Sequence, residues 1–428
     1  MKKLIAMLLA LIMVLGLVAC GAEEAPAATE APAANNEPAA TEAAGEDAPA
    51  DVEPIVIGMS QPLTGTNALV GDSALKGAQI AIDQINAAGG VLGRPLTLIN
   101  YDDQGNPEEG VKLATRLLED DKVDWISSSL ISSVILAQAP TFDDAGIILL
   151  GTGTSSTWMA PGYEHVFRPS PAAGSVYPAM AATAAELGIK TIAIFRGTDD
   201  SSASGAQDFT NAAEAVGIEI IGVETYNDGD TDFSGQAIKL ANMGADAIFT
   251  STYSVVQAQF AKQLRQSGYT GLVFNKEAVT VEHIKAAGPA HDYYIFSWPY
   301  VTYNSLDEIN PETDPVMYKF CEDYMAKYNE MPYHDCAYRQ YDSILALAAA
   351  AEAAGSIDSD AMAEALNTKV NNIQGLGGVI DFTSDANGPH EGLVEYTAWI
   401  ILNEQFVRLD EWVQSDEFKA MQAEFGAN

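Results

Sequence analysis

The chain has 428 residues, of which 48% are hydrophobic and 19% charged, and its formal net charge is −38. This length and apolar content suffice for two packed domains of ordinary size. With 21 basic residues against 59 acidic ones, the chain cannot neutralise many phosphates, which argues against nucleic acid as a partner. The acidic excess is compatible with an exported protein kept soluble by its charge, and it identifies no ligand.

The first predicted element is an export signal over residues 1–19. Lys2 and Lys3 precede a short apolar run that stops before Cys20. A basic start and a short apolar core are typical of a secretory signal, and the run is too short to span a bilayer. Cys20 at the break resembles the cysteine of a bacterial lipobox, which implies that it is lipidated. The alternative is an ordinary secretory signal with a chance cysteine. We expect an extracytoplasmic bacterial protein, lipid-anchored to the cell membrane, at the cell surface or in the periplasm.

The next segment, residues 20–53, is rich in Ala, Pro, Glu and Thr and shows no apolar periodicity. Such a composition cannot bury a core, so the segment is predicted to be a disordered tether. Its role would be to hold a folded body away from the lipid surface.

From residue 54 onward, short β-branched runs alternate with amphipathic helical segments. The predicted strands include 55–57, 96–99, 125–126, 147–150, 191–195, 219–223, 247–249 and 272–274. The predicted helices between them include 72–88, 107–120, 206–216, 233–243 and 255–267. Later come helices at 315–328, 337–354 and 360–369, and strands at 379–382 and 396–402. This alternation predicts an α/β protein with doubly wound parallel sheets, and the units are too many for one modest sheet.

Two cysteines remain if Cys20 is lipidated. An exported chain with two cysteines invites a disulfide. However, Cys321 falls inside one predicted helix and Cys336 at the start of the next, so their close approach is not assured. We predict two separate buried thiols.

The chain offers little that resembles catalytic machinery. The five histidines have no metal-ligand spacing, and Ser73–Lys76 matches an acylation motif without its companion motifs. Gly151–Thr154 lacks the third glycine and the lysine of a phosphate loop. Since no nucleophile has a placed base, we expect no enzymatic activity, no metal and no cofactor.

One stretch of the sequence carries a more specific residue pattern than the rest. Its residues are Pro62–Gly65, Gly71, Gly77-Ala78, Ile85–Leu96 and Asp102-Asp103. This pattern resembles the leucine/isoleucine/valine-binding protein family, which are type I periplasmic binding proteins serving branched-chain amino acid ABC importers. The resemblance extends from residue 53 to about 409, and it implies two lobes joined by three crossovers around a ligand cleft. We place lobe 1 at 54–171 and 303–384, and lobe 2 at 172–302 and 385–428.

Hydroxyl-rich segments follow two neighbouring predicted strands. Ser132 and Ser133 open a helix after the strand at 125–126, and residues 151–156 follow the strand at 147–150. Ligands of open α/β sheets lie at the carboxyl ends of the strands, against helix N-termini. The pattern therefore predicts a carboxylate pocket, although these serines can also cap helices. The resemblance implies ligand contacts from Ser132 and Ser155 and from the backbone of Gly153.

The second lobe is expected to supply the opposite charge. The resemblance implies that Glu277, just past a predicted strand, holds the ammonium group of an α-amino acid. It also places Tyr253 in the cleft. The alternatives are a solvated acid in a very acidic protein and an aromatic residue of a surface loop.

Three positions depart from the family pattern. Val70 stands where the family has an aromatic residue, and Ser201 and Ser202 lie in a stretch where it has a tyrosine. We therefore expect a wider and wetter pocket than one built for leucine.

The segment that lines the family's side-chain pocket contains Tyr338 and Arg339 here. Arg339 is expected either to meet a polar or acidic ligand side chain or to pair with a nearby acid. Trp158 is expected either to cover the pocket or to pack in the core.

These observations predict a solute-binding lipoprotein of an ABC importer that captures a branched-chain or related amino acid and delivers it to a membrane permease. Its expected partners are the permease and ATPase subunits, the membrane and a small-molecule ligand, and monomer is the family default. The alternatives are a ligand-sensing receptor subunit of the same fold and a binder of a small amide or carboxylate. An exported hydrolase would need a nucleophile–base pair that the sequence does not offer.

Overall fold

The computed structural model describes residues 52–276, 278–384, 388–392 and 397–425. The predicted export signal, Cys20 and most of the predicted tether lie outside these residues, as does Glu277. In the described part of the chain, no helix combines the length and the apolar character that crossing a membrane requires.

The first sheet has five parallel strands in the order β2-β1-β3-β4-β5. Its strands are β1 (Ile55–Gln61), β2 (Leu96–Asp102), β3 (Trp125–Ser127), β4 (Leu149–Leu150) and β5 (Val166–Phe167). The chain winds outward from β1 in both directions, so the strand order reverses beside it. In doubly wound folds ligands bind where the order reverses, outside the carboxyl ends of the strands.

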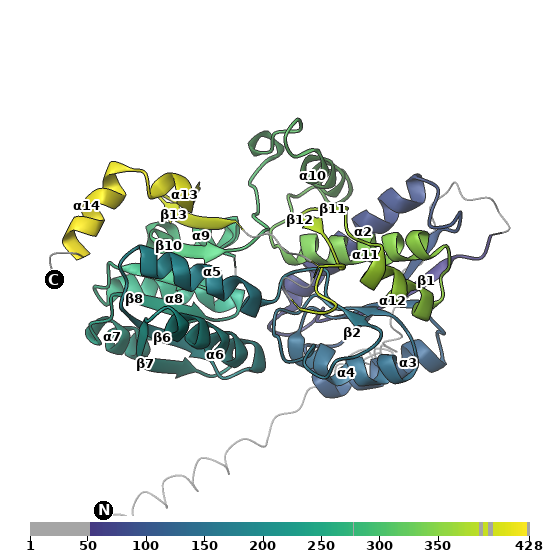
Figure 1. Cartoon of the computed structure of the whole chain (residues 1–428), viewed down its shortest axis with the longest axis horizontal. Coiled ribbons are helices and arrows are strands. Elements are labelled where there is room, and N and C mark those ends of the chain that lie inside the picture. Colours follow the sequence, from purple (N-terminus) through teal and green to yellow (C-terminus); the bar gives the residue numbers. More distant parts are fainter. Residues whose placement is uncertain (1–51, 277, 385–387, 393–396, 426–428) are drawn as a thin grey trace, which may run out of the picture. The chain divides into compact units, whose positions relative to one another are not determined.

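Helices cover both faces of this sheet. They are α2 (Ala68–Ala87), α3 (Pro107–Glu119), α4 (Ser132–Asp144), α11 (Cys336–Ala354) and α12 (Ser359–Thr368). One hydrophobic cluster joins the sheet to α2 and α11, and another joins it to α3 and α4 on the other side (Figure 1). The start of α3 shows how local sequence sets a helix boundary. The Asn106 side chain accepts hydrogen bonds from Glu108 N and Glu109 N, and Pro107 occupies the first turn.

The second sheet has seven strands in the order β14-β13-β10-β9-β8-β6-β7. Its parallel strands are β6 (Thr191–Gly197), β7 (Glu219–Tyr226), β8 (Ala247–Ser251), β9 (Leu272–Asn275) and β10 (Tyr294–Ser297). Two antiparallel strands, β13 (Ala398–Leu402) and β14 (Gln405–Arg408), extend one edge.

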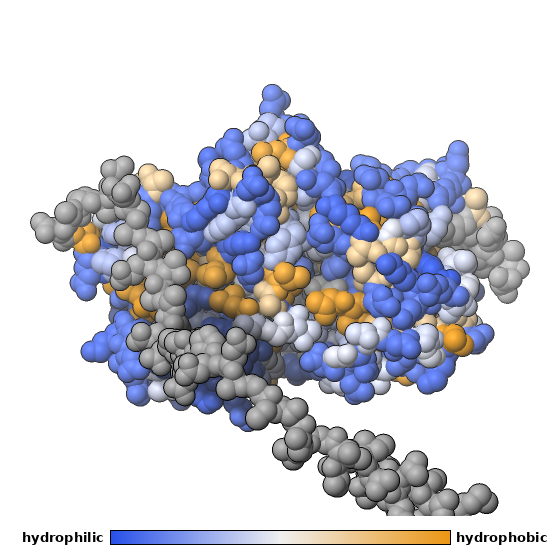
Figure 2. All heavy atoms as spheres, turned by 180° about the vertical axis from the view of Figure 1, so that it is seen from behind, coloured by the Kyte–Doolittle hydropathy of each residue, from blue (hydrophilic) through white to orange (hydrophobic). Residues whose placement is uncertain are grey.

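The remaining elements mostly surround the second sheet. They are α5 (Ala173–Glu186), α6 (Asp200–Ala215), α7 (Ser234–Asn242), α8 (Ser254–Gln266), α9 (Val281–Ala287), α13 (Leu409–Trp412) and α14 (Asp416–Phe425). Helix α10 (Pro315–Tyr328), the 3-10 turns Gly288–His291 and Leu306–Glu308, and the hairpin β11 (Ile373–Gly375) and β12 (Gly378–Ile380) complete the described elements. The core includes stacked rings, such as Phe195 on Phe260 with centroids 3.8 Å apart. Figure 2 shows a largely hydrophilic face with hydrophobic areas across its middle.

The predicted α/β class with two parallel sheets is confirmed. Some boundaries differ: α6 begins at residue 200 rather than 206, because the Asp199 side chain accepts a hydrogen bond from Ser202 N and caps the helix there. Both Cys321 and Cys336 are buried free thiols, as predicted.

The chain passes from the first sheet to the second after β5. After β10 it returns to α11, which packs on α2 and β3, and after β12 it passes to β13 of the second sheet. Two of these passages are joined to each other, because Arg168 N donates to His390 O and Gly392 N donates to Arg168 O. The lobe boundaries at residues 171/172, 302/303 and 384/385 remain a prediction, in which the two sheets form the lobe cores.

Candidate functional site

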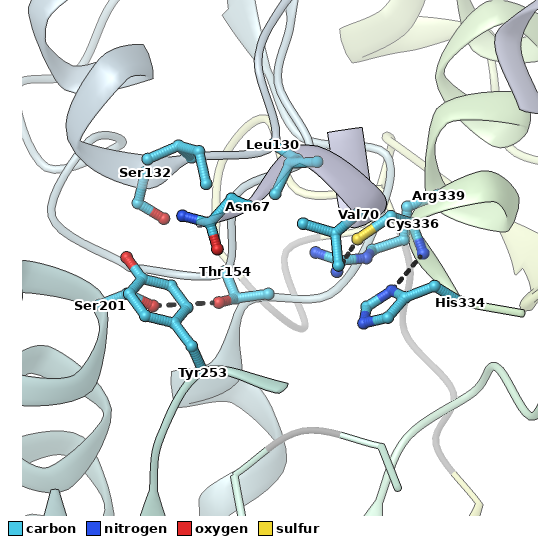
Figure 3. A pocket seen from close by; sticks show the side chains of 11 residues that line it. Asn67, Val70, Leu130, Ser132, Thr154, Ser201, Tyr253, His334, Cys336 and Arg339 are labelled. Carbon is cyan, nitrogen blue, oxygen red and sulfur yellow. Dashed lines mark hydrogen bonds between the residues drawn. The ribbon is translucent and has the colours of Figure 1, made fainter. Parts of the chain in front are cut away.

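A small cavity of about 30 Å³ lies where strand ends and helix starts converge. It is lined by Asn67, Val70, Leu130, Ile131, Ser132, Thr154, Ser201, Tyr253, His334, Cys336 and Arg339 (Figure 3). These residues come from the start of α2, the loops after β3 and β4, the start of α6, the residue before α8 and the start of α11. The cavity therefore has walls from elements of both sheets.

The hydroxyl-rich segments after β3 and β4 meet at this cavity. The Oγ of Ser132, the first residue of α4, accepts a hydrogen bond of 3.2 Å from Ser155 N. Gly153 packs so closely that a Cβ there would lie 2.7 Å from Ser132 Oγ. The structure thus brings together Ser132, Gly153 and Ser155, and we call residues 153–155 the serine turn. Ser133 is half-buried and does not line the cavity.

A buried arginine supports the serine turn from behind. Arg168, only 1% exposed, follows β5, and its Nη1 donates to Ser155 O at 2.7 Å and to Gly153 O at 3.2 Å. Its Nε donates to Glu391 Oε2 at 2.6 Å, and its Nη2 pairs with the other oxygen of that carboxylate. Charge-assisted bidentate pairs of this kind fix orientation as well as adding energy. The pairing of Arg168 with Glu391 cannot be read from the sequence, because 223 residues separate them.

Trp158 belongs to the core rather than to the cavity wall. It is fully buried in the cluster with α3 and α4, and its Nε1 donates to Gly153 O at 3.2 Å. The Arg168 guanidinium lies 4.8 Å from its ring centroid. Of the two expectations for Trp158, the core role is the one observed.

Ser201 and Tyr253 line the cavity from the side of the second sheet. Ser201 Oγ lies 3.4 Å from Thr154 Oγ1 and accepts a hydrogen bond of 2.5 Å from the buried Lys276 Nζ. Tyr253 is the N-cap residue of α8 and is half-buried. Ser202 is also buried, but its backbone N–H donates to the capping side chain of Asp199, and it does not line the cavity.

An acidic residue contacts the same region. Asp200 Oδ2 accepts hydrogen bonds from Ser155 Oγ at 3.3 Å and from Thr157 Oγ1 at 3.0 Å. The Ser155 hydroxyl, which the sequence assigned to a ligand carboxylate, is therefore engaged with a protein carboxylate in this structure. Asp200 cannot be singled out from the sequence, because an acid at a helix start is common and carries no ligand signal.

A second buried ionic network borders the cavity at the start of α11. Arg339 Nε lies 3.1 Å from Asp335 Oδ2, and Arg339 also donates to Thr152 O at 2.8 Å and to Cys336 Sγ at 3.0 Å. His334 Nδ1 lies 2.8 Å from Asp335 Oδ1. Arg339 thus lines the cavity and pairs with a nearby acid at the same time.

Burial and charge act in opposite directions on this network. Burial lowers the pKa of His334, but interactions with Cys336 and Asp335 outweigh it and raise the pKa to about 10. Burial raises the pKa of Asp335, but the charges of Arg339 and His334 lower it by a larger amount. The pKa of Asp335 therefore lies well below its usual range. The donor atoms of His334, Asp335 and Cys336 lie within 4.8 Å of one another. Because the Arg339 cation already contacts two of these residues, we assign them to an ionic network and not to a metal site.

The other predicted residues fall in different surroundings. Val70 lines the cavity, but Tyr338 is fully buried against Phe320 and Tyr300, and it does not line the cavity. A cavity of about 30 Å³ has room for about two water molecules. The expected wide pocket is therefore not found at this point of the structure.

The chain belongs to a family of ligand-binding proteins. Residues 54–394 match the family model described as "Periplasmic binding protein". The "Leucine-, isoleucine-, valine-, threonine-, and alanine-binding protein" of Pseudomonas aeruginosa is 28% identical over 315 residues, which cover 73% of this chain and 82% of that protein. The resemblance found in the sequence is thus confirmed.

Two solved structures agree with this assignment. The leucine-binding protein LivK of Thermotoga maritima is 26% identical, with a TM-score of 0.70 over 83% of this chain and 99% of its own. The branched-chain amino acid transporter substrate-binding protein LivJ of Streptococcus pneumoniae, solved with isoleucine, has the same TM-score over 83% and 98% of the two chains. At 23% identity, the second similarity shows the fold alone.

Proposed function

We propose that this protein is an extracytoplasmic solute-binding protein of an ABC importer that captures an amino acid, branched-chain or related, and delivers it to a membrane permease. The proposal is carried by the small cavity, because Ser132 and Thr154 of the serine turn line it together with Ser201 and Tyr253. A ligand that contacts both sides favours their approach only by the free energy of those contacts. The relatives named above bind amino acids according to their names, which supports the choice of solute.

In this proposal the carboxylate of the ligand lies at Ser132 and the serine turn. The N-terminus of α4 and the backbone N–H groups there suit an anion. Glu277 holds the ammonium group. Asp200, which accepts a hydrogen bond from Ser155, is a second acid close enough to interact with that group. Val70, Tyr253 and Arg339 complete the wall around the ligand.

The proposal also covers the location of the protein. The export signal over residues 1–19 directs the chain out of the cytoplasm, Cys20 carries a lipid, and the segment up to residue 53 links that anchor to the folded body. Permease and ATPase subunits are its partners, and the protein acts by binding rather than by catalysis.

Calorimetry of the purified protein with the common amino acids, small amides and small carboxylates tests this function. We expect binding of at least one amino acid, weakened about tenfold or more in Ser132→Ala, because a hydrogen bond to a charged group contributes about 1.5–3 kcal/mol. Ser133→Ala, at the neighbouring serine that does not line the cavity, is the matched control.

A second variant tests the role of the acid. Glu277→Gln should weaken amino acid binding, since it removes the partner of the ammonium group. Binding of amine-free carboxylates that is unaffected by this change would instead favour the carboxylate-binder alternative. Failure of every amino acid to bind would reject the proposed function.

A further inference from the structure

A larger cavity of about 740 Å³ lies beside the small one, and we call it the side chamber. Val70 and His334 line both cavities, so these two side chains stand at the junction. The side chamber has walls from the first turn of α2, from α8 and α9, and from the segment that precedes α11. The side chamber and the candidate ligand site therefore share part of their walls.

The side chamber displays apolar side chains that water reaches. Leu69 is 70% exposed, Val255 48% and Met325 38%, and all three line it. Covering such side chains with an apolar group is favourable, because it removes apolar surface from water. Charged groups such as Glu282, Lys285 and Glu330 also line it, so a ligand there meets both apolar and polar surface.

Size separates the roles of the two cavities. The small cavity, with room for about two waters, matches the two oxygens of a carboxylate but not a whole amino acid. Pockets for small molecules typically have volumes of about 300–1,000 Å³, and the side chamber falls in this range. The greater part of a ligand whose carboxylate lies at the serine turn thus has to lie in a neighbouring space.

We propose that the side chamber receives the apolar group of the ligand, and that this group is bulkier than the side chain of leucine, such as an aromatic ring. The inference rests on the proposed function and narrows its ligand class to carboxylates that carry a large apolar substituent. The carboxylate lies at Ser132 and the serine turn, and the apolar group passes between Val70 and His334 to reach Val255. His334 Nε2 is buried and has no hydrogen-bond partner among the described residues, so it is a polar contact at the junction.

The test uses a variant that fills the side chamber and a control of equal exposure. Val255→Trp places a large ring in the chamber, and Val223→Trp places the same ring on β7 outside it, at a side chain that is also 48% exposed. Calorimetry of the wild type with alanine, leucine, phenylalanine and tryptophan should show affinity rising with apolar size, with about tenfold or more between the extremes. Val255→Trp should abolish this gain for the aromatic ligands, whereas Val223→Trp should preserve it.

Two results would overturn the inference while leaving the proposed function intact. One is tightest binding of alanine or leucine, and the other is aromatic binding that Val255→Trp leaves unchanged. If no amino acid binds, the proposed function fails, and the fluorescence of anilinonaphthalene sulfonate, an anionic aromatic probe, judges the side chamber separately. Fluorescence lost in Val255→Trp and kept in Val223→Trp supports the chamber as a site for aromatic anions, and equal fluorescence in both rejects it.

Discussion

Two buried ionic networks flank the small cavity, and they differ in what their charged groups face. Arg168 lies behind the serine turn, with its guanidinium engaged by the Glu391 carboxylate and by the carbonyls of Gly153 and Ser155. Arg339 and Asp335 are paired just as closely, but Arg339 forms part of the cavity wall itself.

The first network supports the cavity wall from behind, whereas the second network forms part of that wall. A group that is fully engaged behind a turn fixes the shape of the site without touching a ligand. A group on the wall can respond to a ligand, since its surroundings change when the cavity fills. We therefore expect substitutions in the first network to act mainly on stability and on turn geometry, and substitutions in the second to act on ligand affinity as well.

The largest expected effect is that of Arg168→Met. It leaves the buried Glu391 carboxylate unpaired, and breaking a buried pair in this way costs about 3–5 kcal/mol of unfolding free energy. Urea unfolding followed by circular dichroism measures the loss. The double variant Arg168→Met, Glu391→Leu should recover part of the stability, because it removes the orphaned charge. Recovery of stability without recovery of ligand affinity would identify Arg168 as a positioning residue, whereas full recovery of both would contradict that role.

Asp335→Asn should have a smaller effect on stability, about 2 kcal/mol. The amide oxygen can still accept the hydrogen bond from Trp298 Nε1, but it loses the charge that pairs with Arg339 and His334. Ligand affinity should change too, because Arg339, which loses its charged partner, lies on the cavity wall. Unfolding and calorimetry on the same preparation give both quantities. An unchanged affinity would place Asp335 with the supporting network instead.

The pH dependence of stability distinguishes the networks further. The pKa of His334 is raised from 6.5 to about 10. The stabilisation of the folded state by protonated His334 is therefore fully present below pH 6.5 and is lost as the pH rises through 10. The stability difference between the wild type and His334→Gln should therefore shrink as the pH rises from 6.5 to 10. The difference between the wild type and Arg168→Met should stay nearly constant over the same range, because arginine does not titrate there. Parallel curves for the two variants would refute the assignment.

The smallest expected effect is that of Cys336→Ser, at less than about 1 kcal/mol. The serine hydroxyl can accept the hydrogen bond that Arg339 now donates to the sulfur, so the network keeps its connections. Thermal unfolding measures this change. A loss as large as that of Asp335→Asn would mean that the thiol contributes more to the network than its contact with Arg339 and its interaction with His334 indicate.

Much of the fold could be predicted from local pattern. The helix predicted at 315–328 coincides with α10, where Asp314 caps the first turn and Pro315 opens it. The meeting of Ser132 with the serine turn could also be anticipated, because the carboxyl ends of neighbouring parallel strands share one edge of the sheet.

Other features carry no local signal. The pairing of Arg168 with Glu391 depends on how distant segments approach, and each residue alone reads as an ordinary surface charge. Strand β5 has only two residues, too short for a periodicity to detect, whereas β4 lies within the strand predicted at 147–150. The small cavity and the side chamber both depend on side-chain packing across elements far apart in the chain.

The backbone hydrogen bonds between Arg168 and residues 390 and 392 have a mechanical consequence. They join two of the three passages between the sheets at one isolated β-bridge, formed by Arg168 and Glu391. A rotation of one sheet against the other that pulled these two passages apart would therefore have to break both hydrogen bonds, so we expect the two passages to move together at this point.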